Sequence, residues 1–329
     1  MSLKPFSAAL ALGLAVSLSA CGGSSSDTAS ASSGGGDDSI VMGFAQVGAE
    51  SGWRTANTKS VQESAKKAGV ELKFSDAQQK QENQIKAMRT YIQQGVDVIA
   101  FSPVVESGWD TVLKEAKDAK IPVILTDRAV DSKDETLYET FLGSDFVLEG
   151  EKAGQWVAEE FKDATGPVNI VELQGTTGSA PANDRKAGFA KAIEANPNLK
   201  IVESQTGEFT RAKGKEVMEA FLKSQKQIDV LYAHNDDMGL GAIEAIKAAG
   251  LKPGEDIKIV TVDAVKDGMT ALAAGKINFI VECSPLLGPQ LMDIGAKVLA
   301  GEKVEQRIVT EETTFTPEQA KVELPNRKY

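Results

Sequence analysis

Short apolar runs alternate with longer amphipathic stretches along most of the chain. The runs at residues 40–45, 96–101 and 122–126 have the length and composition of buried strands, and the stretches at 53–68 and 81–93 have helical spacing. Neighbouring parallel strands are joined by crossovers that contain a helix, so this alternation predicts a parallel sheet with helices on both faces. The first part of the chain is therefore expected to form a doubly wound α/β lobe.

The same alternation repeats with different residues after residue 147. A chain of 329 residues is long enough for two lobes of ordinary size. We expect an N-terminal lobe and a C-terminal lobe that consist, respectively, of residues 38–143 plus 284–308 and of residues 144–283 plus 309–329. These boundaries predict a hinge made of three chain crossings, near residues 143–144, 283–284 and 307–310.

The beginning of the chain has the pattern of an export signal followed by a tether. The apolar run at residues 6–20 is shorter than the roughly 18 residues that a spanning helix needs, and it ends in Leu-Ser-Ala-Cys-Gly. This ending resembles the bacterial lipoprotein signal, which implies that residues 1–20 are removed, that Cys21 is lipidated and that residues 21–37 are a flexible tether. The protein would then be exported and anchored to the outer face of the cytoplasmic membrane. The alternative is an ordinary signal peptide that happens to contain a cysteine.

Composition excludes several kinds of partner and chemistry. The formal net charge of −11 disfavours nucleic acid and anionic lipid as ligands. Cys283 is the only cysteine besides Cys21, so we expect a buried thiol and no internal disulfide. The sequence has no nucleophile motif, no phosphate-binding glycine loop and no Cys/His metal spacing, and adjacent Asp236 and Asp237 cannot straddle a glycosidic bond. We therefore expect no enzyme, no catalytic residue, no cofactor and no metal.

Polar and aromatic side chains follow the carboxyl ends of the predicted strands, where open α/β sheets bind their ligands. The two lobes contribute Trp53, Arg54, Asp127 and Arg128 from the first, and Arg185, Asn235 and Asp263 from the second. Carboxylates and amides accept hydrogen bonds from hydroxyls, arginines donate paired hydrogen bonds, and an aromatic face covers the apolar side of a sugar ring. The two rims together predict a site for a monosaccharide.

These residues carry a resemblance to a known family. The order Asp127-Arg128, Arg185, Phe209, Asn235 and Asp263 resembles the periplasmic-binding-protein fold (type I) of the ribose and galactose class, the solute receptors of ABC importers. Four segments are also similar to the galactofuranose receptors of that class, at residues 50–54 (ESGWR), 78–85 (QQKQENQI), 172–175 (ELQG) and 232–238 (YAHNDDM). The resemblance implies a monomeric, exported receptor that captures a monosaccharide and delivers it to the permease of an ABC importer.

The resemblance also implies roles for single residues. Asp127, Arg128, Arg185, Asn235 and Asp263 would bind ring hydroxyls, and Phe209 would form an apolar wall. Trp53 and Arg54 stand where ribose receptors have paired phenylalanines, which implies a larger furanose such as galactofuranose. Glu282 lies at the third hinge strand, where the ribose pattern has a glutamine, and is expected at the ligand.

Several of these positions have a structural alternative. Asp127 and Arg128 could be a structural ion pair, and Trp53 could belong to the core. His234 is the only histidine and directly follows a buried strand, so we interpret it as a packing residue. Asp237 is interpreted as a helix cap.

Other functions stay open at this point. Gln79 or Gln81 could reach the ligand from a predicted helix start. The receptor could serve a membrane sensor in place of an importer, or bind a different small polar solute. A transcriptional regulator with the same core would need a DNA-binding headpiece before residue 40, where this chain has its export signal.

Overall fold

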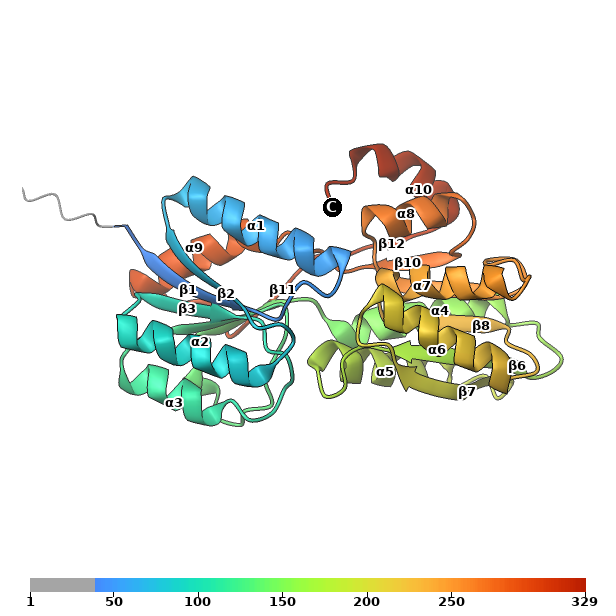
Figure 1. Ribbon diagram of the computed structural model, residues 1–329, viewed down its shortest axis with the longest axis horizontal. Helices are drawn as coiled ribbons and strands as arrows, with labels where there is room; N and C mark the ends of the chain where they lie inside the picture. Colours follow the sequence, from blue (N-terminus) through green and yellow to red (C-terminus); the bar gives the residue numbers. More distant parts are fainter. Residues whose placement is uncertain (1–38) are drawn as a thin grey trace, which may run out of the picture. The chain divides into compact units, whose positions relative to one another are not determined.

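The structure is a computed structural model that describes residues 39–329. The expected signal at residues 1–20, the lipidated Cys21 and the tether at residues 21–37 lie outside the described residues. None of the helices between residues 39 and 329 is both long enough and apolar enough to cross a membrane. The described residues form two sheets, each covered by helices on both faces (Figure 1).

The first sheet is entirely parallel, with the strand order β11-β5-β4-β3-β1-β2. Its strands are β1 Val41–Gln46, β2 Glu71–Asp76, β3 Val98–Phe101, β4 Val123–Thr126, β5 Thr140–Gly143 and β11 Arg307–Val309. Helices α1 Gly52–Ala68 and α9 Gly288–Leu299 cover one face, and α2 Gln81–Gln94 and α3 Asp110–Asp118 cover the other. A 3₁₀ turn, η1 Glu135–Leu137, precedes β5.

The second sheet has the order β12-β10-β9-β8-β6-β7, with only the edge strand β12 antiparallel. Its strands are β6 Val168–Gln174, β7 Leu199–Thr206, β8 Val230–Ala233, β9 Lys258–Asp263, β10 Phe279–Glu282 and β12 Thr314–Phe315. Helices α4 Phe146–Glu160 and α5 Ala180–Ile193 pack together on one face. The other face carries α6 Arg211–Ser224, α7 Asp236–Ala248, α8 Lys266–Ala273 and α10 Pro317–Glu323, followed by η2 Leu324–Asn326.

Helix ends near the ligand edge of the sheets are fixed by specific caps. The Ser51 hydroxyl accepts a hydrogen bond from the Arg54 amide at 3.1 Å and so begins α1 directly after the carboxyl end of β1. The helix ends at Gly69, whose φ of 71° is the left-handed conformation that glycine adopts without strain. The Ser51 cap therefore determines where the first residues of α1 lie relative to the sheet.

The predicted fold of two doubly wound α/β lobes is confirmed. The pattern of the sequence did not indicate strand β5 or helix α10. These elements are short, so they carry too few residues for a recognisable period.

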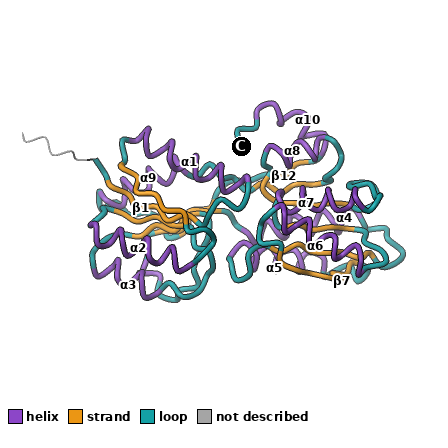
Figure 2. The backbone as a smooth tube through the Cα atoms, viewed as in Figure 1, coloured by secondary structure: helices purple, strands orange, loops and turns teal. Residues whose placement is uncertain are grey.

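The chain passes between the two sheets at three places, after β5, after β10 and after β11 (Figure 2). We retain the lobe boundaries expected from the sequence as a proposal. One side chain bonds to all three connections: Glu312 Oε1 accepts hydrogen bonds from Ser144 Oγ at 2.5 Å, from the Ser284 amide at 3.0 Å and from Thr310 Oγ1 at 2.9 Å. Burial, with the nearby carboxylate of Glu149, raises the pKa of Glu312 to about 8. Glu312 is therefore a shared partner of all three hinge connections, beside direct contacts such as the hydrogen bond that Arg307 Nη2 donates to the Ser144 carbonyl at 2.6 Å.

Candidate functional site

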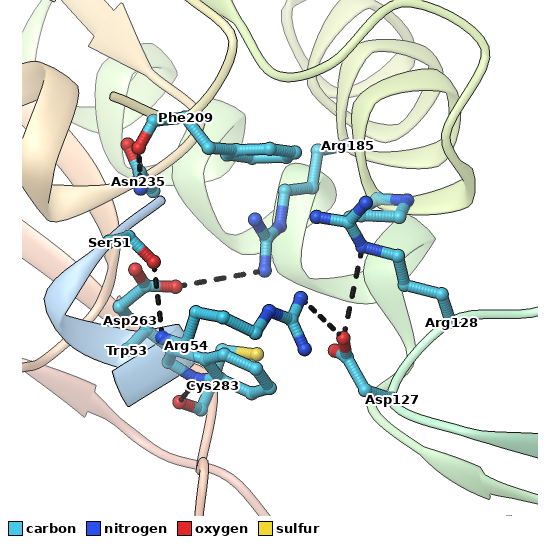
Figure 3. A pocket seen from close by; sticks show the side chains of 11 residues that line it. Ser51, Trp53, Arg54, Asp127, Arg128, Arg185, Phe209, Asn235, Asp263 and Cys283 are labelled. Atoms are coloured by element: carbon cyan, nitrogen blue, oxygen red, sulfur yellow. Dashed lines mark hydrogen bonds and ion pairs between the residues drawn. The ribbon is translucent and has the colours of Figure 1, made fainter. Parts of the chain in front are cut away.

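The carboxyl ends of both sheets face one cavity (Figure 3). The cavity, its mouth included, has about 280 Å³ of space free of protein atoms. Both lobes line it with Ser51, Trp53, Arg54, Asp127, Arg128, Pro181, Arg185, Phe209, Asn235, Asp263 and Cys283. All the site residues expected from the sequence are in this set except Glu282.

The first lobe contributes a buried cluster of two arginines and two carboxylates. Arg54 Nη2 lies 2.7 Å from Asp127 Oδ2, and Arg54 Nε lies 3.0 Å from Glu50 Oε1. Arg128 is farther from both carboxylates, at 3.6 Å from Glu50 and 3.8 Å from Asp127. Burial opposes the charge of Arg54, but Asp127 and Glu50 outweigh burial and raise the pKa of Arg54. Burial and the neighbouring charge of Arg54 lower the pKa of Arg128 to about 10, so this guanidinium still carries its charge at neutral pH.

Asp127 is held in place by its backbone and by a serine. It follows β4 in the left-handed conformation with a φ of 64°, and its amide donates to the Leu142 carbonyl at 2.8 Å. Ser102 Oγ donates to Asp127 Oδ2 at 2.8 Å. The main ionic partner of Asp127 is Arg54 and not the adjacent Arg128, so the alternative of a structural pair between the two neighbours in sequence finds little support.

Arg185 is the corresponding group of the second lobe. Its Nε lies 2.6 Å from Glu149 Oε2, its Nη1 donates to the His234 carbonyl at 2.7 Å, and its Nη2 lies 4.0 Å from Asp263 Oδ1. Burial raises the pKa of the Asp263 carboxyl well above its usual value, despite the nearby Arg185. A protonated Asp263 can donate as well as accept a hydrogen bond.

Two aromatic side chains form apolar walls of the cavity. Trp53 Nε1 donates to the Cys283 carbonyl at 2.7 Å, and the Arg54 guanidinium lies 4.7 Å from the centre of the Trp53 ring. Trp53 is only 5% exposed and also packs against the core of the second lobe. It is therefore both a wall of the cavity and a core residue. The ring of Phe209 lies directly over Gly175, where any side chain would overlap it. This overlap explains why the motif at residues 172–175 ends in glycine.

Asn235, and not Asp237, caps helix α7. Its Oδ1 accepts from the Met238 amide at 3.0 Å, and its Nδ2 donates to the Phe209 carbonyl at 3.1 Å. Asp237 is therefore not the cap, because Asn235 occupies that position, but it lies in the first turn of α7, where an acidic side chain complements the helix dipole. Asp237 instead contacts the other lobe, where its Oδ2 accepts from the Gly52 amide at 2.7 Å.

His234 is a packing residue, as its position after a buried strand suggested. It is fully buried, and its Nε2 lies 3.1 Å from Glu172 Oε1. Its Nδ1 accepts from the Gly175 amide at 3.4 Å, so the neutral ring carries its proton on Nε2. Burial lowers the pKa of His234, which also favours the neutral form.

Glu282 does not lie at the cavity. Its carboxylate is 2.8 Å from Arg327 Nη1 and accepts from the Tyr329 hydroxyl at 2.9 Å, on a different surface of the second lobe. The next residue, Cys283, lines the cavity in its place, because successive side chains of an extended segment point in opposite directions. The assignment of Glu282 to the ligand is therefore corrected.

Further residues, which were not expected at the site, support it from behind. Glu50 and Glu149 hold the arginines, and of these two only Glu50 lies in one of the four similar segments. Gln84 is fully buried and donates to the carbonyls of Ala45 and Ser102 at 3.2 and 2.6 Å. Neither Gln79 nor Gln81 lines the cavity, and Gln81 instead donates to a loop carbonyl at 2.6 Å.

One group of side chains has the composition of a metal site. Ligand atoms of Glu149, Cys283 and Glu312 lie within 4.8 Å of one another. Two of them already have protein partners, since Glu149 pairs with Arg185 and Glu312 accepts three hydrogen bonds of the hinge. These contacts account for the cluster as part of the hinge, and we assign it no metal.

The sequence is similar to known proteins over most of its length. The protein-family model described as periplasmic binding protein domain matches residues 42–303. This chain belongs to the periplasmic binding protein family. The galactofuranose-binding protein YtfQ of Escherichia coli is 50% identical over 293 residues, which are 88% of this periplasmic binding protein and 92% of YtfQ.

Solved structures of this family have the same fold. A protein from Mycobacterium smegmatis in complex with β-D-fucofuranose is 67% identical, with a TM-score of 0.87 over 88% of this chain and 96% of that chain. The periplasmic binding protein component of an arabinose ABC transporter from Shewanella, bound to α- and β-L-arabinofuranose, is 53% identical, with a TM-score of 0.85 over 88% of this chain and 96% of that chain. The similarity spans both lobes and therefore includes the cavity between them.

Proposed function

We propose that this periplasmic binding protein captures a monosaccharide in its furanose form, such as galactofuranose, and delivers it to the permease of an ABC importer. The observation that carries the proposal is the cavity itself, in which arginine, carboxyl and amide groups from both lobes face two aromatic walls. Hydroxyl groups on both faces of a small sugar ring would bind both rims at once. The furanose ligands named for its relatives support the same class of ligand.

The charges around the cavity favour an uncharged ligand. Arg54 and Arg128 lie beside the carboxylates of Glu50 and Asp127, and Arg185 pairs with Glu149. The arginines are therefore neutralised by the protein and do not need an anionic ligand. A neutral sugar fits this balance, whereas a uronic acid would add an unpaired charge to a buried site.

The proposed mechanism is closure of the two lobes around the sugar. A ligand that bonds to both rims binds the closed arrangement more tightly than the open one, so it shifts the population towards closure. The closed arrangement would then be what the permease recognises. A membrane sensor as the partner is the second candidate.

We also propose that the protein is a monomeric lipoprotein without catalytic activity or cofactor, anchored outside the cytoplasmic membrane by lipidated Cys21. Mass spectrometry of the mature protein tests this anchor. The expected result is an N-terminal peptide that begins with a diacylglyceryl-modified Cys21, and a Cys21→Ser variant should leave the membrane fraction. A mature protein that begins elsewhere would contradict the proposal.

A thermal-shift screen of the purified protein tests the ligand. Suitable probes are D-galactose, D-fucose, L-arabinose, D-fructose and D-ribose, whose solutions contain both ring forms, with D-galacturonate as the charged control. A ligand at about a hundredfold over its dissociation constant adds roughly 2.7 kcal/mol to the free energy of unfolding. We expect a shift with galactose, fucose or arabinose and none with galacturonate. No shift with any neutral sugar would reject the proposed function.

A further inference from the structure

The carboxylate of Asp237 joins the two lobes without lining the cavity. Its Oδ2 accepts from the Gly52 amide of the first lobe at 2.7 Å, and Arg211 of its own lobe lies 3.0 Å from its Oδ1. Asp237 is only 6% exposed, and it is not among the residues that line the cavity. The hydrogen bond between Asp237 and Gly52 therefore joins the two lobes directly, outside the cavity.

The local geometry suits an ionised carboxylate. Gly52 is the first residue of α1, and Asp237 lies in the first turn of α7, so the carboxylate is next to the N-termini of two helices from different lobes. Unpaired amides and the helix dipole favour negative charge at both positions. A Cβ at Gly52 would lie 3.4 Å from Asp237 Oδ2, in ordinary van der Waals contact, so the two residues are immediate neighbours.

We propose that Asp237 is a closure residue, which stabilises the closed arrangement of the lobes and thereby sets the affinity for every ligand by the same factor. The inference rests on the proposed function. Gly52 on α1 and Asp237 on α7 belong to different lobes, so the hydrogen bond between them exists only while the lobes are closed. In the open arrangement the Gly52 amide is free to bond to water, and Asp237 keeps only its own helix and Arg211.

The closing equilibrium enters the apparent affinity directly. When the binding-competent arrangement is only partly populated, the apparent dissociation constant rises as that population falls. A residue that contacts the sugar changes the affinities of different sugars by different factors. A residue that acts only on closure weakens all of them equally, which distinguishes Asp237 from the residues of the cavity.

The test uses Asp237→Asn and a matched control. Arg211 also pairs with Asp267 of the same lobe at 3.0 Å, and the side chain of Asp267 is 67% exposed. Asp267→Asn therefore removes one carboxylate partner of Arg211 without affecting the contact between Asp237 and Gly52. Dissociation constants are measured by calorimetry for two sugars that the wild-type protein binds, such as L-arabinose and D-galactose. Dissociation rates are measured by stopped-flow tryptophan fluorescence.

Asparagine keeps an oxygen that can accept from the Gly52 amide but loses the negative charge beside two helix N-termini, so we expect Asp237→Asn to weaken the binding of both sugars about tenfold, which corresponds to about 1.4 kcal/mol. Most of the change should be faster dissociation, the ratio of the two dissociation constants should stay within twofold of the wild-type ratio, and Asp267→Asn should bind like the wild type. The sugar-free variants should unfold at the same urea concentration. Unchanged affinity of Asp237→Asn, a changed ratio between the sugars, or an equal loss in Asp267→Asn would overturn the inference.

A separate readout distinguishes the inference from the function on which it rests. Failure of the proposed function appears in the wild-type protein, as absence of sugar binding. In that case, small-angle scattering of the sugar-free proteins tests closure directly. A larger radius of gyration for Asp237→Asn than for the wild type and Asp267→Asn would support the closure role, and identical radii would reject it.

Discussion

The replacement Glu312→Gln should change how the stability of this protein depends on pH. Glu312 accepts hydrogen bonds from all three hinge connections, and burial, with the carboxylate of Glu149, raises its pKa to about 8. In the unfolded chain a glutamate titrates near 4.3. Because the folded pKa is the higher one, the stability that this group contributes is fully present below the unfolded pKa. It is lost as the pH rises through about 8.

The size of the effect follows from the interval between the two pKa values. Each pH unit in that interval lowers the free energy of unfolding by at most about 1.4 kcal/mol, so over the three units between pH 5 and pH 8 the limit is roughly 4 kcal/mol. Glu312 is partly accessible to solvent, and we expect about half of this limit. Glutamine keeps the oxygen that accepts the three hydrogen bonds but does not titrate. The variant should match the wild type at pH 5 and exceed it by about 2 kcal/mol at pH 8.

Urea unfolding at four pH values from 5 to 8 measures this difference. Burial raises the pKa of Asp236 to about 7, so this group also titrates in this range. Asp236 is present in both proteins, and its effect cancels when the curves are subtracted. The neighbouring and exposed Glu311→Gln is the control and should give no difference that grows with pH. A constant difference between Glu312→Gln and the wild type at every pH would refute the reasoning.

Three further replacements test the cavity. Arg185→Ala should abolish sugar binding, measured by calorimetry. It should also lower the free energy of unfolding in urea by about 3–5 kcal/mol, because it leaves the buried Glu149 without its partner. Gly175→Ala should displace the ring of Phe209 and weaken sugar binding at least tenfold in calorimetry, because its methyl group would overlap the ring. Trp53→Phe should keep the apolar wall but lose the hydrogen bond of the indole, which lowers the free energy of unfolding in urea by about 1 kcal/mol.

Each of these predictions has a result that contradicts it. A loss below about 1 kcal/mol in Arg185→Ala would mean that water solvates the remaining carboxylate. Native affinity in Gly175→Ala would show that Phe209 moves without consequence for the ligand. Stability of Trp53→Phe equal to that of the wild type would mean that the indole hydrogen bond contributes nothing in the sugar-free protein.

Much of the fold and of the cavity could be predicted because both follow from one local rule. Parallel strands alternate with helices, and the residues after each strand meet at the same edge of the sheet. Asp127 directly follows β4 and Asp263 is the last residue of β9, and both line the cavity. The contacts behind the cavity depend on packing between distant elements. Glu149 lies on α4, and nothing near it in the sequence indicates that Arg185 of α5 is its partner.

Glu282 shows the limit of the rule at a strand end. Its position in the sequence suggested a ligand contact, but the C-terminal residues Arg327 and Tyr329 fold back onto the second lobe and bind its carboxylate. The direction of a side chain at the last position of a strand depends on such contacts, which a short strand pattern does not contain. The sequence around Asp237 likewise does not indicate its partner, because Gly52 lies in the other lobe.

The distribution of charge between the lobes has a consequence for the energy of closure. Within residues 39–329, the ion pairs around the cavity join groups of the same lobe: Arg54 with Asp127 in the first, and Arg185 with Glu149 in the second. Opening the lobes therefore separates no close pair of opposite charges at the cavity, and each rim keeps its geometry in the open arrangement. The free energy of closure must then come from the hydroxyl groups of the sugar and from neutral or singly charged contacts such as that of Asp237 with Gly52. Such a design makes closure responsive to the ligand, because strong ion pairs between the lobes would hold the protein closed without it.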